Sequence, residues 1–213
     1  RNSADAVRLL VEAGADLTAR TNNPPSGRVA QMTVFLSPPP TGFTALLFAV
    51  RAGSLSAARA LLDAGARVND TLSDGQSALV VAIANAHWEM ADMLLDRGAD
   101  PRLAGAGWNA LHQAIHSRRP NLGYTPGPVP TGSLDSINVV KKLIARGVDV
   151  NARMMRNGMK DGQRNRLNRL GATPFLLASK TTDLEVLKLL VAAGADATIP
   201  TADGTTPLMV AAG

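Results

Sequence analysis

Residues 74–100 read DGQSALVVAIANAHWEMADMLLDRGAD and hold two short amphipathic segments between turn signals. Asp74-Gly75 favours a turn because both residues tolerate positive φ. Apolar residues at helical spacing over 78–84 and 88–97 predict two short helices. Gly98 comes directly after the second run and is typical of a left-handed helix C-cap. Neither helix can bury its apolar face alone, so this stretch requires neighbours of the same kind.

The same unit recurs along the chain with a period near 33 residues. Leu79 follows Leu46 by 33 residues, and Leu111 follows Leu79 by 32. Leu208 follows Phe175 by 33. A turn and two helices repeated at this period are typical of ankyrin arrays.

The chain also resembles the ankyrin-repeat family in its motifs. Ala172–Phe175 (ATPF) and Thr205–Leu208 (TTPL) are similar to the T-P-L opening of that family, and Leu111–Ala114 (LHQA) is similar to its L-H-x-A continuation. Gly-Ala-Asp triplets begin at Gly14, Gly98 and Gly194. Alanine replaces the usual helix-opening proline at Ala45, Ala78 and Ala110, which is a mild departure. The resemblance implies an all-α solenoid of stacked helix-turn-helix units with hairpin loops.

Three long insertions interrupt the repeats of this single expected domain, residues 1–213. In order, we expect a partial repeat 1–20, an insertion 21–40, repeats 41–73, 74–106 and 107–153, an insertion 117–134 within the last of these, an insertion 154–170, a repeat 171–201 and a partial repeat 202–213. The first and third insertions are expected at hairpin tips, and the second at the opposite edge, between two helices. Residues 29–36 are expected to form a strand or short hairpin. We interpret the chain as a piece of a longer array.

Composition agrees with an elongated domain made of thin layers. The chain is 46% hydrophobic and only 3% aromatic, as expected of a core of alanine and leucine. It contains no cysteine, which excludes disulfides and thiolate chemistry. It has no run of 18 apolar residues, so no membrane span is predicted. The alanine-rich repeats and proline-rich insertions resemble bacterial ankyrin proteins, some of which are exported. Bacterial cytoplasm and periplasm both fit, and we expect a monomer.

The insertions carry the positive charge of the chain. The third insertion has five cations against Asp161, a net charge of +4, whereas the whole chain has +5. These cations are Arg156, Lys160, Arg164, Arg166 and Arg169. They could attract an acidic protein, or they could be solvated and paired with acidic residues of neighbouring repeats. Nucleic acid is disfavoured because the loop has no aromatic residue to stack on bases.

Two aromatic residues are candidate anchors for a partner. Phe43 and Trp108 each follow a hairpin glycine, at a position that varies between units. The resemblance implies that hairpin tips and first helices form the concave binding face, where an exposed Trp108 would suit an interface anchor. The alternative is that Trp108 packs against its own insertion. Trp88 occupies the place of Leu55 and is expected to pack between repeats.

No catalytic or metal site is predicted. His112 and His116 are four residues apart, but no glutamate follows His112 as in a H-E-x-x-H zinc site. His112 falls on the structural L-H position of the family, and His87 on its end-of-helix histidine. The sequence has neither a G-x-S-x-G motif nor a phosphate-binding glycine loop. No cofactor is therefore expected.

The sequence thus favours a non-enzymatic module that binds another protein through hairpin tips, first helices and a basic loop. Two alternatives stay open. One is a structural spacer in a larger multidomain protein, which would tolerate changes in the loops. The other is an accessory domain of an enzyme encoded in the missing flanks.

Overall fold

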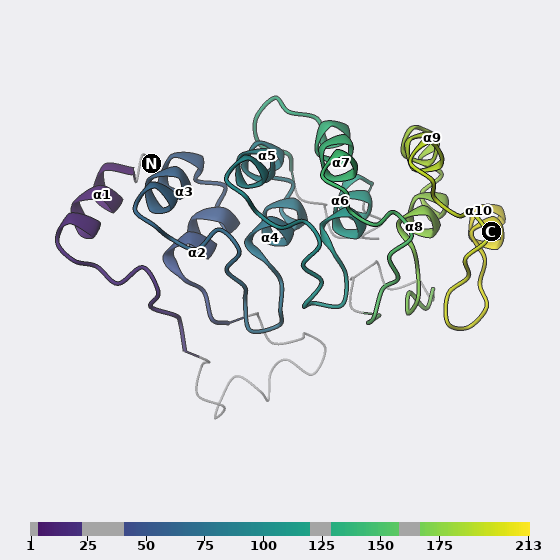
Figure 1. The fold of residues 1–213 in the computed structure, drawn as a ribbon, viewed down its shortest axis with the longest axis horizontal. Coiled ribbons are helices and arrows are strands. Elements are labelled where there is room, and N and C mark those ends of the chain that lie inside the picture. Colours follow the sequence, from purple (N-terminus) through teal and green to yellow (C-terminus); the bar gives the residue numbers. More distant parts are fainter. Residues whose placement is uncertain (1–3, 23–40, 120–128, 158–166) are drawn as a thin grey trace.

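The computed structural model describes residues 4–22, 41–119, 129–157 and 167–213, and its helices stand in two rows (Figure 1). The first helix of each unit lies in one row, the second helix lies in the other, and the hairpin loops project beyond the first row. In chain order the described helices are α1 (Ala4–Glu12), α2 (Ala45–Arg51), α3 (Leu55–Asp63), α4 (Ala78–Ala84), α5 (Trp88–Asp96), α6 (Ala110–Arg118), α7 (Ser136–Ala145), α8 (Pro174–Lys180), α9 (Leu184–Ala192) and α10 (Pro207–Ala212). The described part of the chain contains one isolated bridge, between Thr71 and Ser77, and no strand. The predicted all-α solenoid is confirmed.

The first helices begin at side-chain caps. In α2, Thr44 accepts a hydrogen bond from the backbone N–H of Leu47, and in α4, Ser77 accepts one from Val80. Such caps satisfy amide groups that have no partner within the helix. The same position is held by Asn109 before α6, Thr173 before α8 and Thr206 before α10. These caps explain why helices of six to nine residues start at fixed places in the repeat.

Positive φ angles separate the helices of each unit. Gly98 follows α5 with φ +87°, the left-handed conformation that glycine adopts without steric cost. Between the first and second helices, Ala86 and Thr182 adopt φ 55° and 48°. They occupy the place that Gly53 takes in the preceding repeat. The sharp reversal between paired helices is therefore kept even where glycine is replaced.

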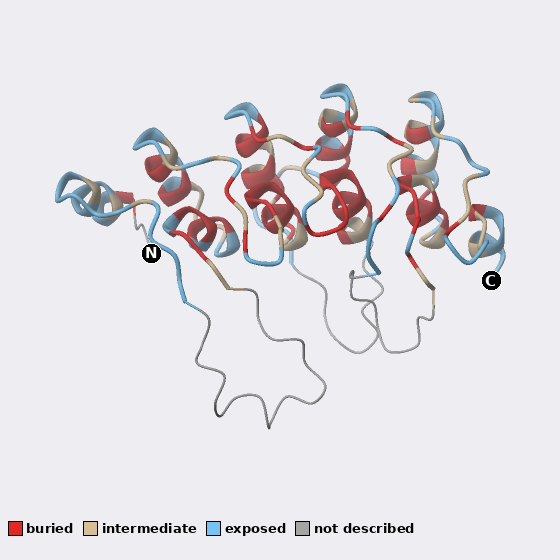
Figure 2. Ribbon diagram, turned by 60° about the horizontal axis from the view of Figure 1, so that its bottom comes forward, coloured by how far each residue is buried: buried red, intermediate tan, exposed pale blue. Residues whose placement is uncertain are grey.

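The core is a row of buried layers between the helices rather than a central mass (Figure 2). Neighbouring first helices pack on one another, from α2 through α4, α6 and α8 to α10, and α2, α4, α6 and α8 each pack on the second helix of their own unit. Leu94 of α5 is fully buried, as predicted, and Trp88 is 3% exposed. Burial of such side chains stabilises the array by about 1.5–3 kcal/mol each.

One boundary differs from the sequence-based one. Helix α6 continues to Arg118, two residues into the predicted 117–134 insertion, and Ser117 is buried. Asp135 caps α7 by accepting a hydrogen bond from the Ile137 N–H. The expected strand or hairpin at 29–36 lies outside the described residues.

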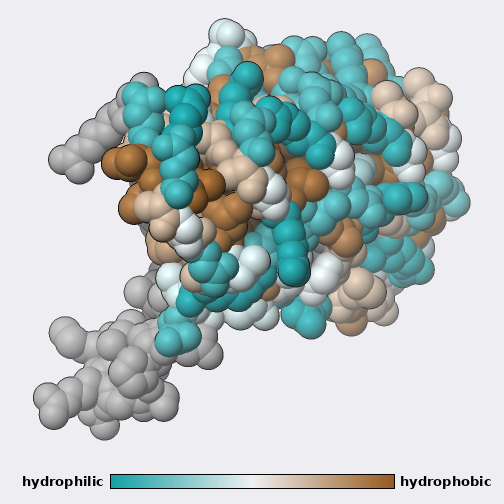
Figure 3. All heavy atoms as spheres, turned by 60° about the vertical axis from the view of Figure 1, so that its left-hand side comes forward, coloured by the Kyte–Doolittle hydropathy of each residue, from teal (hydrophilic) through white to brown (hydrophobic). Residues whose placement is uncertain are grey.

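Large apolar side chains are exposed at both ends of the array. The N-terminal end shows a gathering of hydrophobic residues (Figure 3). Helix α1 exposes Leu9 (67%) and Leu10 (59%), and α10 exposes Leu208 (79%) and Met209 (62%). Of the helices in the described ranges, none combines the length and apolar character required to cross a bilayer.

Candidate functional site

Trp108 is buried, so the prediction that it is an exposed anchor is wrong. Its side chain is only 9% exposed. The indole N–H donates to Oε1 of Gln113 at 2.8 Å, and Gln113 Nε2 in turn donates to Ser117 Oγ at 3.0 Å. All three side chains are buried, and Gln113 and Ser117 belong to α6. Trp108 therefore fixes its own hairpin to the following helix and presents little surface to a partner.

Phe43 is buried as well, which contradicts its prediction as an exposed aromatic. It is 5% exposed, because the Phe48 ring lies 4.9 Å from it and the Arg51 guanidinium covers it at 5.2 Å. Phe48 is the residue that reaches solvent, at 50% exposure. The sequence held a signal for this, because Leu46, Leu47 and Val50 define the buried stripe of α2 and Phe48 lies off it.

The basic third insertion is only partly described. Lys160, Arg164 and Arg166 lie outside the described residues. Arg156 is exposed, as a partner-facing cation must be. Arg169 is 3% exposed, and burial lowers the pKa of its guanidinium from the ordinary value. The prediction that Arg169 faces a partner is therefore wrong, since its side chain is buried.

Two exposed apolar residues lie at the base of the same insertion as Arg156, and the motifs of the sequence did not point to them. Met155 is 63% exposed and Leu170 is 41% exposed. The Met155 N–H donates to Gly107 O at 2.8 Å, so the third insertion starts directly beside the Trp108 hairpin. A Cβ added at Gly107 would lie 2.8 Å from Cβ of Arg156. The hairpin side thus presents Met155, Arg156 and Leu170, which we call the insertion-base surface.

The second insertion lies at the edge of the array opposite the hairpin tips, and its first residues bond to neighbouring helices. Arg118, whose side chain is 12% exposed, donates to Asp183 of α9 at 2.7 Å and to Ser136 of α7 at 2.8 Å. It also forms ion pairs with Asp135 and Glu185. This cation is therefore held between units. Arg118 thus pairs with Asp135 of its own repeat and with Asp183 and Glu185 of the next one.

The far end of the second insertion crosses back to the preceding unit. Thr131 Oγ1 lies 3.0 Å from His87 Nδ1, and Glu89 accepts hydrogen bonds from the Ser133 N–H (2.9 Å) and hydroxyl (3.2 Å). The Ser133 bonds lower the pKa of Glu89. One segment thereby contacts the units on both sides of its own.

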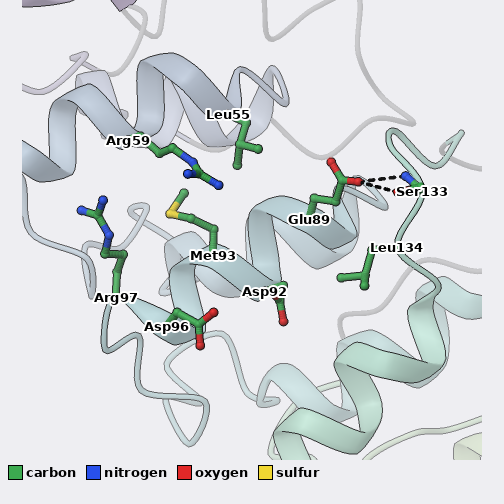
Figure 4. Close-up of a pocket in the computed structure, with 9 residues that line it drawn as sticks. All are labelled: Leu55, Arg59, Glu89, Asp92, Met93, Asp96, Arg97, Ser133 and Leu134. Atoms are coloured by element: carbon green, nitrogen blue, oxygen red, sulfur yellow. Dashed lines mark hydrogen bonds between the residues drawn. The ribbon is translucent and has the colours of Figure 1, made fainter.

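A groove of about 380 Å³ lies beside this segment, between α3 and α5 (Figure 4). Its lining residues are Leu55, Arg59, Glu89, Asp92, Met93, Asp96, Arg97, Ser133 and Leu134. Lys142 bridges Asp92 (2.5 Å) and Asp96 (2.8 Å), and Arg97 pairs with Asp63 (2.7 Å). Because these charged side chains already form ion pairs between helices, the groove fits a structural role in the array.

His112 and His87 contact backbone carbonyl groups that are distant in the sequence. His112 is fully buried, and its Nε2 lies 3.0 Å from Ala152 O and 3.3 Å from Ala172 O, so Nε2 carries the hydrogen. In the capping box at the start of α6, Nδ1 lies 3.5 Å from the Asn109 N and 2.8 Å from Asn109 Oδ1. Desolvation lowers the pKa of His112 to about 4. His87 Nε2 lies 3.1 Å from Arg51 O. No group of three or more His, Cys, Asp or Glu residues suited to a metal ion occurs within the described ranges.

Residues 1–105 match a family model described as ankyrin repeats (3 copies). No curated protein matches the chain. Beyond residue 105, the paired helices α6–α7 and α8–α9 continue the arrangement of the matched part, with the same cap position at the start of each first helix.

Proposed function

Because this chain belongs to the ankyrin-repeat family, whose domains generally mediate protein–protein interaction, we propose that it is a non-catalytic module that binds an acidic protein on its hairpin side. The observation that carries the proposal is the insertion-base surface. There, two exposed apolar side chains, Met155 and Leu170, lie at the base of the same insertion as the exposed cation Arg156. An apolar centre with a charged rim is the usual anatomy of a protein interface.

Charge and apolar contact have separate roles in this proposal. The 154–170 insertion carries a net charge of +4, which attracts an acidic partner before contact. Exposed charges are screened over about 8–10 Å at physiological salt, so this attraction mainly raises the association rate and makes it salt-dependent. Desolvation of Met155 and Leu170 slows dissociation of the complex. If the two residues form a hot spot, they contribute on the order of 2 kcal/mol to the binding free energy.

The experiment compares three variants of the full chain against a partner captured by pull-down, with rates from surface plasmon resonance. Neutralising Arg156, Arg164 and Arg166 to glutamine is expected to slow association and leave dissociation nearly unchanged. Replacing Met155 and Leu170 by serine is expected to do the reverse. Excising 120–128 is expected to leave both rates unchanged, because that insertion lies at the other edge.

A charge-matched control separates the loop from the overall charge. Arg59, Lys141 and Lys188 are exposed on α3, α7 and α9, in the row of second helices. Changing all three to glutamine alters the net charge by the same amount. An equal loss of association rate in this control would show that the effect comes from the overall charge of the chain and not from the loop. If only the 120–128 excision weakens binding, the partner uses the opposite edge and the proposal fails.

A further inference from the structure

Two arginines occupy the same place in the repeat, directly before the two hairpin-side insertions. Arg20 follows the helix-ending Gly14 by six residues, and Arg153 follows Gly147 by six. The equivalent positions in the other hairpins are Thr71, Ala104 and Pro200. Arginine therefore stands at this position in the two hairpins that carry an insertion and in none of the other three.

The uninterrupted hairpins at 65–77 and 194–206 close with two backbone hydrogen bonds. The Leu72 N–H donates to Gln76 O at 2.9 Å, and the Gly75 N–H donates to Leu72 O at 3.0 Å. Thr201 and Thr205 repeat the first of these bonds in the last hairpin, at 2.9 Å. Three residues separate the paired positions in both hairpins.

The same two bonds close the base of each hairpin-side insertion, which we call its neck. They are Thr21 N–H to Phe43 O (3.0 Å) and Gly42 N–H to Thr21 O (3.2 Å) in the first neck, and Met154 N–H to Ala172 O (2.9 Å) and Gly171 N–H to Met154 O (2.7 Å) in the second. The paired positions are now separated by 21 and 17 residues. Both insertions are thus additions to the tip of an otherwise ordinary hairpin.

A longer loop brings its ends together less often. Because the closure entropy grows as (3/2)R ln n, replacing three residues by 17 or 21 makes closure of the neck roughly tenfold to twentyfold less favourable. A hairpin with an insertion therefore requires another contact to keep its neck as firmly closed as a short hairpin.

Each arginine makes such a contact. Arg20 Nη1 donates to Gly42 O and to Thr71 O, both at 2.8 Å, and Nη2 pairs with the carboxylate of Asp70. Arg153 donates from Nε to Gly171 O (3.2 Å) and from Nη2 to Pro200 O (2.9 Å). Both side chains start on the N-terminal arm of a neck, bond the glycine of its C-terminal arm, and reach the same position of the next hairpin. A guanidinium suits this task because its donors form a rigid fork.

We propose that Arg20 and Arg153 are positioning residues that hold the two necks closed and so fix the direction in which each insertion leaves the array. Arg153 does this for the neck that bears Met155 and Leu170. This inference goes beyond the protein-binding proposal, and its test uses no partner, so either can fail while the other stands.

The alternative is that each arginine only links neighbouring repeats, regardless of the length of the loop that follows it. A double-mutant cycle distinguishes these roles. In one background residues 155–171 are replaced by Ser-Asp-Gly, the sequence of the uninterrupted hairpin at 73–75; the other background is the full chain. Arg153→Ala is introduced into both, and Arg102→Ala, which removes an exposed arginine bonded to Asp100 in another hairpin, is the matched control.

The first readout is hydrogen exchange at the Met154 amide. Arg153→Ala is expected to accelerate it about tenfold in the full chain, in line with loss of charge-assisted hydrogen bonds, and much less in the shortened chain. Arg102→Ala is expected to leave it unchanged in both. Equal acceleration in both backgrounds would show that the arginine only links neighbouring repeats, and no acceleration in the full chain would show that the arginine does not close the neck.

The second readout is the distance between two spin labels, which does not change when the folded chain merely becomes less stable. The chain has no cysteine, so cysteines introduced at the exposed Met155 and Lys141 can be spin-labelled specifically. Arg153→Ala is expected to broaden the distance distribution between the labels at a temperature where the helices stay folded. An unchanged distribution would overturn the proposal.

Discussion

Burial of the neutral His112 side chain should make the array less stable as the solution becomes mildly acidic. The pKa of His112 is lowered to about 4 from the ordinary 6.5, chiefly by desolvation. The Ala172 and Ala152 carbonyls and the Asp149 carboxylate act in the opposite direction, to a smaller extent. Between these two pKa values, the unfolded chain binds a proton that the folded chain does not. Stability is therefore complete above pH 6.5 and falls as the pH falls towards 4.

The magnitude follows from the two pKa values. At 1.36 kcal/mol per pKa unit, the full difference corresponds to about 3.4 kcal/mol. Linkage then gives a loss of about 2 kcal/mol between pH 7.5 and pH 5, a range that lies above the ordinary pKa of carboxylates. Urea denaturation at several pH values measures this loss, and nitrogen chemical shifts of the imidazole report directly whether His112 is still neutral at pH 5.

A matched pair of variants assigns the effect to one residue. His112→Gln removes the titrating group and should flatten this part of the pH dependence, whatever its cost in absolute stability. His116→Gln changes a half-buried histidine on the same helix and should retain the dependence. The reasoning is refuted if the pH dependence survives in His112→Gln, or if His112 is already protonated in the folded chain at pH 5.5.

Three further outcomes test the scaffold. Leu94→Ala truncates a fully buried side chain and should lower the free energy of unfolding by about 2–5 kcal/mol in urea titrations; a loss well below 1 kcal/mol would mean that its layer is not close-packed. The amides of α1 should exchange faster than those of α5, because Leu9 and Leu10 are exposed; equal protection would contradict terminal fraying. Arg118→Ala should cost about 1.5–3 kcal/mol, as expected for charge-assisted bonds at a side chain 12% exposed, whereas Arg119→Ala, 53% exposed, should cost less than about 1 kcal/mol. Thermal melts compare these two variants, and equal losses would remove the special role of Arg118.

Sequence periodicity predicted the scaffold because the scaffold is made of local, repeated choices. The caps at Ser77 and Asp135 and the C-cap glycine at Gly98 each depend on a few adjacent residues. The 33-residue step then places equal helices in equal surroundings. For this reason the helices predicted at 78–84 and 88–97 agree with α4 and α5 to within one residue.

The candidate site was harder to predict, because exposure depends on contacts that break the repeat. Trp108 stands at a hairpin-tip position, yet the nearby Gln113 provides a buried acceptor for its indole N–H. Arg169 belongs to a basic run, but the fold turns it inward while Arg156 stays outside. Neither outcome follows from the spacing of residues, since each depends on the particular side chains and backbone around that residue in the folded chain.

The second insertion gives the array an uneven cooperativity. In a solenoid whose units contact only their neighbours, unfolding resembles a one-dimensional Ising chain with a coupling energy at each interface. Arg118 joins the third unit to α9, while Thr131 and Ser133 join it to His87 and Glu89 at the start of α5. One segment thus strengthens two successive couplings. A boundary between folded and unfolded repeats should therefore cross the middle of the array less readily than the ends. The repeats 74–106, 107–153 and 171–201 would then unfold as one block. The basic insertion 154–170 would stay anchored until that block unfolds.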